Sequence, residues 1–344
     1  MPKFRMNLAV AQALADELAS DPTVVFLGED VAGRGGTFKT SEGLLDQFGP
    51  KRVIDTPISE MGFMGAALGA SLRGLRPVVE IMFFEFIAVA LDQLSIEAAK
   101  MRFLSAGELA VPLTVRGSTG AGMGFGATHS GTLETLLYAT PGLKVAVASG
   151  PRTAYGLLRS AIRDDNPVVV LEPRSLYATR EEVETGEASI IPLGEAAIVQ
   201  AGSDVTVVTL GQTVSIAKAA ARLADGWSPE IIDLQTLVPW DRETVRESVA
   251  KTGRLVTLEE NPYSGGWGTE IVADIATHCH QDLVAPPMRI TSPDTPVPFA
   301  PNLERQWLPT DEYTAVQITR LLSDSKVPPP WWSFVPAASA ERAI

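Results

Sequence analysis

The feature that most constrains the fold is a regular alternation of short apolar segments with longer amphipathic ones. Residues 24–28 form a continuous apolar run that ends at Gly28, and similar runs recur along the first half of the chain. The runs that indicate buried strands are residues 24–28, 53–54, 76–81, 111–115, 143–148 and 168–171. Helical spacing separates them at residues 7–20, 86–103 and 153–162. This alternation predicts an α/β fold with mainly parallel sheets.

The alternation is interrupted once, which divides the chain. Residues 174–200 are rich in Glu and Thr, and a second strand and helix pattern begins at Asp204. We therefore expect two α/β domains, the second smaller. The predicted parts are residues 1–175, a linker at 176–200, residues 201–325, and a tail at 326–344 with four prolines and two tryptophans. Because two exposed tryptophans would be unusual, we expect the tail to lie against another surface, and a partly disordered end is the alternative.

Composition excludes several classes of function. The net charge of -13 disfavours a nucleic-acid partner, because an acidic chain repels phosphate. No window approaches the roughly 20 apolar residues of a membrane span, and no signal peptide is recognised. Cys279 is the only cysteine, so the chain has no internal disulfide, which favours a reducing compartment. We expect a cytoplasmic protein, and we interpret the segment from His278 to His280 as a helix end rather than a metal site.

Two glutamates are candidate site residues. Glu29 follows the strand at 24–28, at the carboxyl end where open parallel sheets bind ligands. Glu60 lies in the first turn of an expected helix, with Pro57 at its first position and Thr56 as its cap, and one face of that helix is almost entirely Gly and Ala. Glutamate is common in a first helical turn because of the helix dipole. Beside a closely packed apolar surface, however, it is also a candidate for a shifted pKa.

A glycine-rich segment precedes the only histidine of the first domain. Residues 117–126 contain five glycines but match neither the P-loop nor the dinucleotide-binding fingerprint. We interpret the segment as a close-approach or mobile loop that presents His129, either as a structural hydrogen-bonding residue or as a functional one. The polar turn at 161–167 is either a plain turn capped by Asp164 and Asn166 or a site for a hard cation.

Several of these segments together resemble one family, the beta subunits of the thiamine-diphosphate-dependent 2-oxo acid dehydrogenases. These are part of the decarboxylating first component of the pyruvate, branched-chain and acetoin complexes. The resemblance rests on the order and spacing of residues 29–31, 55–63, 92–93, 129–130, 141–145, 161–167 and 294–296, and it extends to about residue 325. It implies a transketolase-like pyrimidine-binding domain followed by a transketolase C-terminal-like domain.

The resemblance also implies roles for particular residues. Glu60 would exchange a proton with the pyrimidine ring of thiamine diphosphate, and Phe86 would pack against that ring. Glu29 belongs with these two as a cofactor-binding residue, and His129 would face the substrate and the lipoyl group. A structural potassium ion would be held by oxygens of Leu113, Ala161, Ile162, Asp164 and Asn166.

One absence implies a partner. The Gly-Asp-Gly motif with which thiamine enzymes hold the diphosphate and magnesium does not occur in the sequence. The resemblance therefore implies an alpha subunit that supplies this half of the site in an alpha2-beta2 assembly, working with a lipoyl acyltransferase core.

Two departures from the family pattern bear on the substrate. Gly131 stands where the family usually has glutamine, and Ala139-Thr140 stands where a histidine is common.

We expect the substrate to be a small 2-oxo acid, with pyruvate first and acetoin or a branched-chain 2-oxo acid as alternatives. Gly131 leaves more space near the acyl pocket and favours an unusual 2-oxo acid or a diketone-type substrate. Two other classes stay open from the residues. The chain could be a non-catalytic scaffold of the same fold, or a nucleotide-binding dehydrogenase, although its poor glycine fingerprint disfavours the latter.

Overall fold

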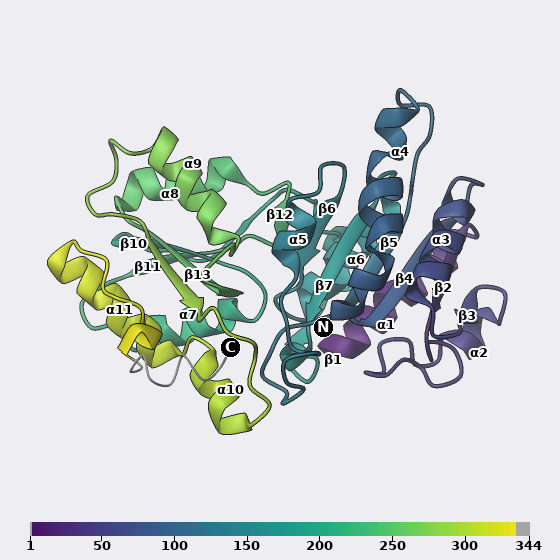
Figure 1. Ribbon diagram of the computed structural model, residues 1–344, viewed down its shortest axis with the longest axis horizontal. Coiled ribbons are helices and arrows are strands. Elements are labelled where there is room, and N and C mark those ends of the chain that lie inside the picture. Colours follow the sequence, from purple (N-terminus) through teal and green to yellow (C-terminus); the bar gives the residue numbers. More distant parts are fainter. Residues whose placement is uncertain (1, 335–344) are drawn as a thin grey trace. The chain divides into compact units, whose positions relative to one another are not determined.

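A computed structural model describes residues 2–334, which form two compact units (Figure 1). Unit 1 comprises the described residues up to Gly120, Gly131–Glu195 and Gln235–Trp240. Unit 2 comprises Ala121–Ser130, Ala196–Leu234 and the described residues from Asp241 onward. Both units therefore consist of separate stretches of sequence. The segment 176–200, predicted as a linker, carries strand β8 (Arg180–Glu182) and strand β9 (Ala197–Gln200).

Unit 1 is built on a seven-stranded sheet, counted over residues 2–334, in the order β12, β6, β7, β5, β4, β2, β3. Its strands are β2 (Val24–Gly28), β3 (Val53–Asp55), β4 (Arg76–Phe83), β5 (Thr114–Thr119), β6 (Lys144–Val147), β7 (Val168–Pro173) and β12 (Thr236–Val238). All neighbours pair in parallel except β12 and β6. Strands β2, β5 and β7 are buried along their whole length, as expected for parallel strands covered on both faces. The predicted α/β class is confirmed.

Helices cover this sheet, and two of the predicted helices differ from the structure. The helical elements of unit 1 are α1 (Met6–Ser20), α2 (Leu44–Phe48), α3 (Glu60–Ser71), η1 (Phe84–Ala90), η2 (Asp92–Ala98), α4 (Ala99–Leu104), α5 (Glu134–Tyr138), α6 (Pro151–Arg163), η3 (Arg174–Leu176) and η4 (Glu187–Ser189). The single helix predicted at 86–103 is a run of three segments, namely 3-10, π and α. Helix α3 begins at Glu60, not at Pro57, because its first backbone bond runs from Phe63 N to Ser59 O at 3.0 Å.

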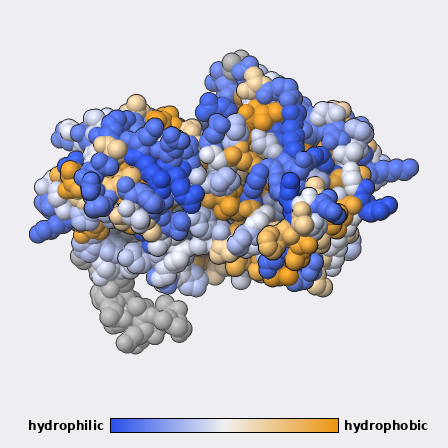
Figure 2. Space-filling view, turned by 90° about the horizontal axis from the view of Figure 1, so that it is seen from above, coloured by the Kyte–Doolittle hydropathy of each residue, from blue (hydrophilic) through white to orange (hydrophobic). Residues whose placement is uncertain are grey.

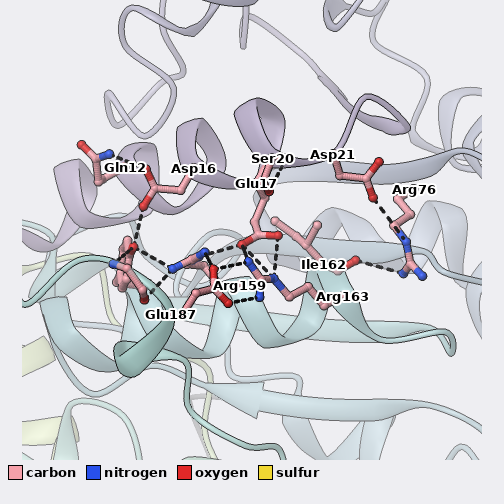
Figure 3. Close-up of polar contacts among 12 residues, drawn as sticks. Gln12, Asp16, Glu17, Ser20, Asp21, Arg76, Arg159, Ile162, Arg163 and Glu187 are labelled. Carbon is pink, nitrogen blue, oxygen red and sulfur yellow. Dashed lines mark hydrogen bonds and ion pairs between the residues drawn. The ribbon is translucent and has the colours of Figure 1, made fainter.

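A charged network joins α1 to α6, and Figure 3 shows it. The buried Glu17 carboxylate accepts hydrogen bonds from Arg159 Nε at 2.7 Å and from Arg163 Nε at 2.9 Å. Glu187 also forms ion pairs with Arg159 and Arg163. Its hydrogen bonds with Arg163 lower the pKa of Glu187 to about 2. These pairs fix the two helices that cover the apolar core around β2 and β7.

Unit 2 contains a five-stranded sheet, counted over the described residues, in the order β14, β13, β10, β11, β9. Besides β9, its strands are β10 (Val205–Thr209), β11 (Pro229–Asp233), β13 (Leu255–Pro262) and β14 (Met288–Ser292). Its helices are α7 (Thr213–Arg222), α8 (Arg242–Thr252), α9 (Gly268–His278), α10 (Pro301–Trp307) and α11 (Asp311–Asp324). Helix α9 ends at His278, so the helix end predicted there is confirmed.

The tail packs on unit 2 as far as the structure describes it. Trp331 N donates to Tyr313 Oη at 2.8 Å, and the two rings are 6.3 Å apart. Trp332 contacts Tyr263 edge to face at 5.7 Å. The expectation that the tail lies against another surface is confirmed for these two tryptophans, and that surface is unit 2. Residues 335–344 lie outside the described part. Between residues 2 and 334, no helix has both the length and the apolar character needed to cross a bilayer.

Candidate active site at the carboxyl edge of the seven-stranded sheet

Glu29 and Glu60 lie close together in unit 1. Glu29 directly follows β2, and Glu60 is the first residue of α3. The segment between β3 and α3 is tied to β2, because Thr56 N donates to Gly28 O at 2.9 Å. Burial raises the pKa of Glu29, and the nearby Glu60 carboxylate and Asp30 raise it further. The pKa of Glu29 is therefore sensitive to the second acid at this sheet edge.

One oxygen of Glu29 has no partner. Glu29 Oε1 is buried and accepts no hydrogen bond from any described residue. The loop after Glu29 is held in place, since Asp55 accepts hydrogen bonds from Ala32 N at 2.7 Å and Gly33 N at 3.1 Å. A buried acceptor without a donor costs about 1–3 kcal/mol, so such atoms often mark a bound ligand. An aminopyrimidine offers N–H donors and therefore fits this position.

Phe86 presents an aromatic ring at the same edge of unit 1. It lies in η1, directly after β4, and its side chain is 37% exposed. Its ring packs edge to face on Phe83, with centroids 6.4 Å apart. An exposed aromatic face in a rigid position can stack on a flat heterocycle. The geometry therefore fits the predicted contact between Phe86 and a pyrimidine, which stays a prediction.

His129 belongs to unit 2, together with residues 121–126 of the glycine-rich segment before it. The buried Glu304 carboxylate accepts hydrogen bonds from Gly122 N at 2.8 Å and Gly124 N at 2.9 Å. Gly126 leaves room for Phe299, whose ring carbon would lie 3.2 Å from a Cβ at this glycine. Of the two interpretations of this loop, close approach fits these contacts. His129 Nδ1 lies 2.7 Å from Thr128 Oγ1, which orients the imidazole.

The predicted potassium ligands surround the turn between α6 and β7. Their oxygens already have protein partners. Ile162 O and Asp164 O accept hydrogen bonds from Arg76 Nη1 at 3.2 and 3.0 Å, and Lys144 pairs with the Asp164 carboxylate. Leu113 O, Ala161 O and Asn166 Oδ1 accept hydrogen bonds from Val168 N, Asp164 N and Arg102 Nη1, respectively. A potassium ion here would share these oxygens with cationic side chains and backbone amides, and the site stays a prediction.

A buried charge cluster near this edge was not anticipated from the sequence. Arg116 in β5 lies between two glutamates of the neighbouring strands, Glu80 in β4 and Glu172 in β7. Arg116 Nε donates to Glu172 Oε1 at 2.7 Å, and Tyr177 Oη donates to Glu172 Oε2 at 2.8 Å. Burial raises the pKa of Glu80 against the opposing effect of Arg116. In the sequence, a single charged residue within an otherwise apolar strand is the feature that could have indicated this cluster.

The raised pKa of Glu29 predicts a pH-dependent effect of Glu29→Gln on stability. The folded-state pKa of Glu29 lies above the unfolded value of about 4.5. The protonated side chain therefore contributes fully to stability below pH 4.5, and this contribution is lost as the pH rises through the folded-state pKa. We therefore expect the variant to gain stability relative to the wild type as pH rises from about 5 to 8. Urea unfolding of both proteins across this range measures the difference. Glu108→Gln, at an exposed turn, is the control. A constant difference across the range would contradict the raised pKa.

Comparison with known proteins places this edge in a recognised domain. Residues 3–180 match the pyrimidine-binding domain of transketolase, and residues 194–313 match the transketolase C-terminal domain. A solved split-gene transketolase, described as an inactive beta4 tetramer, shares the fold with a TM-score of 0.76 and 23% identity over 92% of this chain and 98% of its own.

Curated relatives are similar along most of the chain. A mitochondrial pyruvate dehydrogenase E1 component subunit beta-2 of Oryza sativa is 44% identical over 88% of this chain and 81% of its own. The E1 subunit beta of Bacillus subtilis is 41% identical over 90% and 95%. The beta subunit of the acetoin:2,6-dichlorophenolindophenol oxidoreductase of Cupriavidus necator is 40% identical over 94% and 99%.

Proposed function

The chain belongs to the family of the pyruvate dehydrogenase E1 component beta subunits, and from this premise we propose that it is the beta subunit of a thiamine-diphosphate-dependent 2-oxo acid dehydrogenase. It takes part in the decarboxylation of a small 2-oxo acid, pyruvate first, and in transfer of the acyl group to a lipoyl group. The observation that carries this proposal is the unpartnered oxygen of Glu29, close to Glu60.

Each site residue has a physical task in this proposal. Thiamine diphosphate, when bound, supplies a thiazolium that stabilises negative charge on the substrate carbon. Glu60 holds and returns a proton at the pyrimidine ring nitrogen, and Glu29 accepts a hydrogen bond and adds negative charge beside it. Phe86 packs on the ring. His129 moves protons at the substrate during acyl transfer.

A partner subunit is part of the proposal. The sequence lacks the Gly-Asp-Gly motif, so an alpha subunit supplies the diphosphate and magnesium half of an alpha2-beta2 assembly. Unit 1 supports this with apolar side chains at its surface, since Ile58 is 86% exposed and Phe103 is 87% exposed. Figure 2 shows hydrophobic patches among the hydrophilic surface on the face that it views. The small-residue face of α3, which includes Gly62 and Ala66, is exposed and lines a groove of about 560 Å³.

Further parts of this proposal concern the complex and the cell. The assembled enzyme delivers acyl groups to the lipoyl acyltransferase core of its complex. We also propose a structural potassium ion at the turn between α6 and β7, and a cytoplasmic location. Acetoin is the second candidate substrate, because the Cupriavidus relative is named for it and because Gly131 departs from the usual glutamine.

Co-expression with a cognate alpha subunit tests this function. The purified assembly is offered pyruvate, a branched-chain 2-oxo acid and acetoin with an artificial electron acceptor and thiamine diphosphate. We expect turnover by the assembly, fastest with pyruvate among the 2-oxo acids, and no turnover by the beta chain alone. A stable assembly that turns over none of these substrates would contradict the proposal and favour a non-catalytic scaffold.

A further inference from the structure

The glycine-rich loop of unit 2, residues 121–126, is held by a carboxylate to which the proposed function gives no task. Glu304 lies in α10 and is buried. Its Oε1 accepts a hydrogen bond from Gly122 N at 2.8 Å, and its Oε2 accepts one from Gly124 N at 2.9 Å. Converging backbone N–H groups form an anion-binding concavity, and hydrogen bonds to a charged acceptor are among the strong ones. One buried carboxylate therefore fixes two amides of the same loop.

The backbone of this loop has a conformation that favours glycine at both of these positions. Gly122 has a φ of 102° and Gly124 has a φ of 74°, values that residues with a Cβ rarely adopt. At Gly124 a Cβ would meet no atom within 4 Å, so the backbone angle is the constraint there. The loop thus has one particular shape, and Glu304 is placed to hold it.

Helix α10 is itself fixed within unit 2. Trp307 Nε1 donates to Thr295 O at 2.9 Å, and the Trp307 side chain belongs to an apolar cluster with Ala121 and Val297. Ala121 N also donates to the carboxylate of Glu260, in β13. The start of the loop is therefore attached both to the sheet and to α10, which gives Glu304 a rigid base.

The contact of Glu304 with the loop reaches His129 through a short stretch of backbone. His129 N donates to Gly126 O at 3.2 Å, which joins the histidine to the end of the loop. Gly126 lies against Phe299, two residues before α10. Since the loop rests on α10 and on the residue before its cap, a shift of the loop would also shift the backbone of His129.

We propose that Glu304 is a positioning residue for His129 and places its imidazole for proton transfer to the lipoyl group. This inference rests on the proposed function, in which His129 moves protons during acyl transfer. In that transfer the lipoyl disulfide takes up two electrons and its S–S bond breaks. One sulfur forms the thioester with the acyl group, and the other takes a proton, which His129 supplies. A proton donor must lie within hydrogen-bond reach of the atom that takes the proton, so the place of the imidazole controls this step.

The test compares two assays of the alpha–beta assembly with pyruvate and thiamine diphosphate. One measures acylation of a lipoyl domain of the acyltransferase core, and the other measures turnover with an artificial electron acceptor, which forms neither a thioester nor a thiol. For Glu304→Gln we expect the ratio of the first kcat to the second to fall about 10- to 100-fold, because displacing a catalytic group by about 1 Å costs up to about 100-fold. Glutamine keeps one acceptor oxygen, and its NH₂ group would oppose the other backbone N–H.

Further variants make this ratio specific. Glu312→Gln, at an exposed position in the first turn of α11, is the matched control and should keep the wild-type ratio. His129→Ala should lower the ratio, and adding Glu304→Gln to it should lower the ratio no further, because the glutamate acts through the histidine. Gly124→Ala strains the loop without a steric clash and should also lower the ratio, so it serves if Glu304→Gln does not fold.

Hydrogen–deuterium exchange followed by mass spectrometry supplies a readout besides activity. The peptide that contains residues 121–129 should exchange faster in Glu304→Gln than in the wild type, because two backbone amides lose their charged acceptor. Unchanged exchange of this peptide would overturn the inference, since Glu304 would then not hold the loop.

The outcomes separate this inference from the proposed function. A wild-type ratio in Glu304→Gln would overturn the inference and leave the function in place, because a merely structural residue lowers both rates alike. A further fall of the ratio in the double variant with His129→Ala would also overturn it, since Glu304 would then act independently of the histidine. A wild-type assembly inactive with pyruvate in both assays would overturn the function and the inference together.

Discussion

Replacing Glu60 by glutamine is expected to abolish turnover of 2-oxo acids by the alpha–beta assembly while the fold stays intact. Glutamine keeps the shape of the side chain but cannot exchange a proton with the pyrimidine ring. Losing a positioned acid–base group lowers rates by about 10²- to 10⁴-fold. Because Glu60 begins α3 and its side chain accepts no cap hydrogen bond that the structure records, the helix should tolerate the amide. Steady-state kinetics with pyruvate and an artificial acceptor measure the loss.

Two controls make the Glu60 result interpretable. Glu108→Gln removes an exposed charge from the same unit and should keep wild-type turnover. Circular dichroism and gel filtration of Glu60→Gln with the alpha subunit should match those of the wild-type assembly. If the variant turns over substrate at the wild-type rate, Glu60 has no part in cofactor activation.

Replacing Arg116 by methionine is expected to lower the free energy of unfolding of unit 1 by about 3–5 kcal/mol, the usual penalty for removing one partner of a buried ion pair. Arg116, Glu80 and Glu172 are all almost fully buried. Without the guanidinium, two carboxylates would face each other with no compensating charge. Since burial already raises the pKa of Glu80, we expect part of this loss to be recovered as pH falls and Glu80 takes up a proton.

The Arg116 prediction has an exposed control and a rescue. Arg34→Met removes the partner of Asp30 in a pair that is 78% and 49% exposed, and it should change stability by no more than about 1 kcal/mol. The triple variant with Glu80→Gln and Glu172→Gln should recover much of the loss, because no unpaired buried charge remains. Urea unfolding measures the free energy of unfolding of these three variants and of the wild type. A loss for Arg116→Met no larger than that for Arg34→Met would contradict the account of the cluster.

The architecture could be predicted because strands buried on both faces leave a clear pattern. The apolar run at 24–28 coincides with β2, and the glycine at its end and Glu29 beyond it lie at the sheet edge as expected. Strand β12 was missed for a physical reason. Residues 236–238 lie between strands β11 and β13 of unit 2 in sequence, but they pair with β6 in the sheet of unit 1. Local pattern cannot indicate such a long-range return.

The candidate site could be predicted in its single residues but not in its contacts. Glu29 and Glu60 were each recognisable at the end of a strand and the start of a helix, whereas the effect of Glu60 on the pKa of Glu29 depends on how β2 and α3 pack. No pattern in the sequence indicated the surroundings of Glu85, the residue before Phe86. They depend on its ion pair with Arg174, which lies far along the chain, and on the position of Gly131 beside it.

Exchange of the C2 proton of thiamine diphosphate with solvent deuterium tests the central role of Glu60 most directly. The experiment follows this proton by NMR in the alpha–beta assembly, without substrate, for the wild type and for Glu60→Gln. Fast exchange with the wild type, and exchange near the rate of free thiamine diphosphate with Glu60→Gln, is the predicted result. Equally fast exchange with both proteins would contradict the assignment.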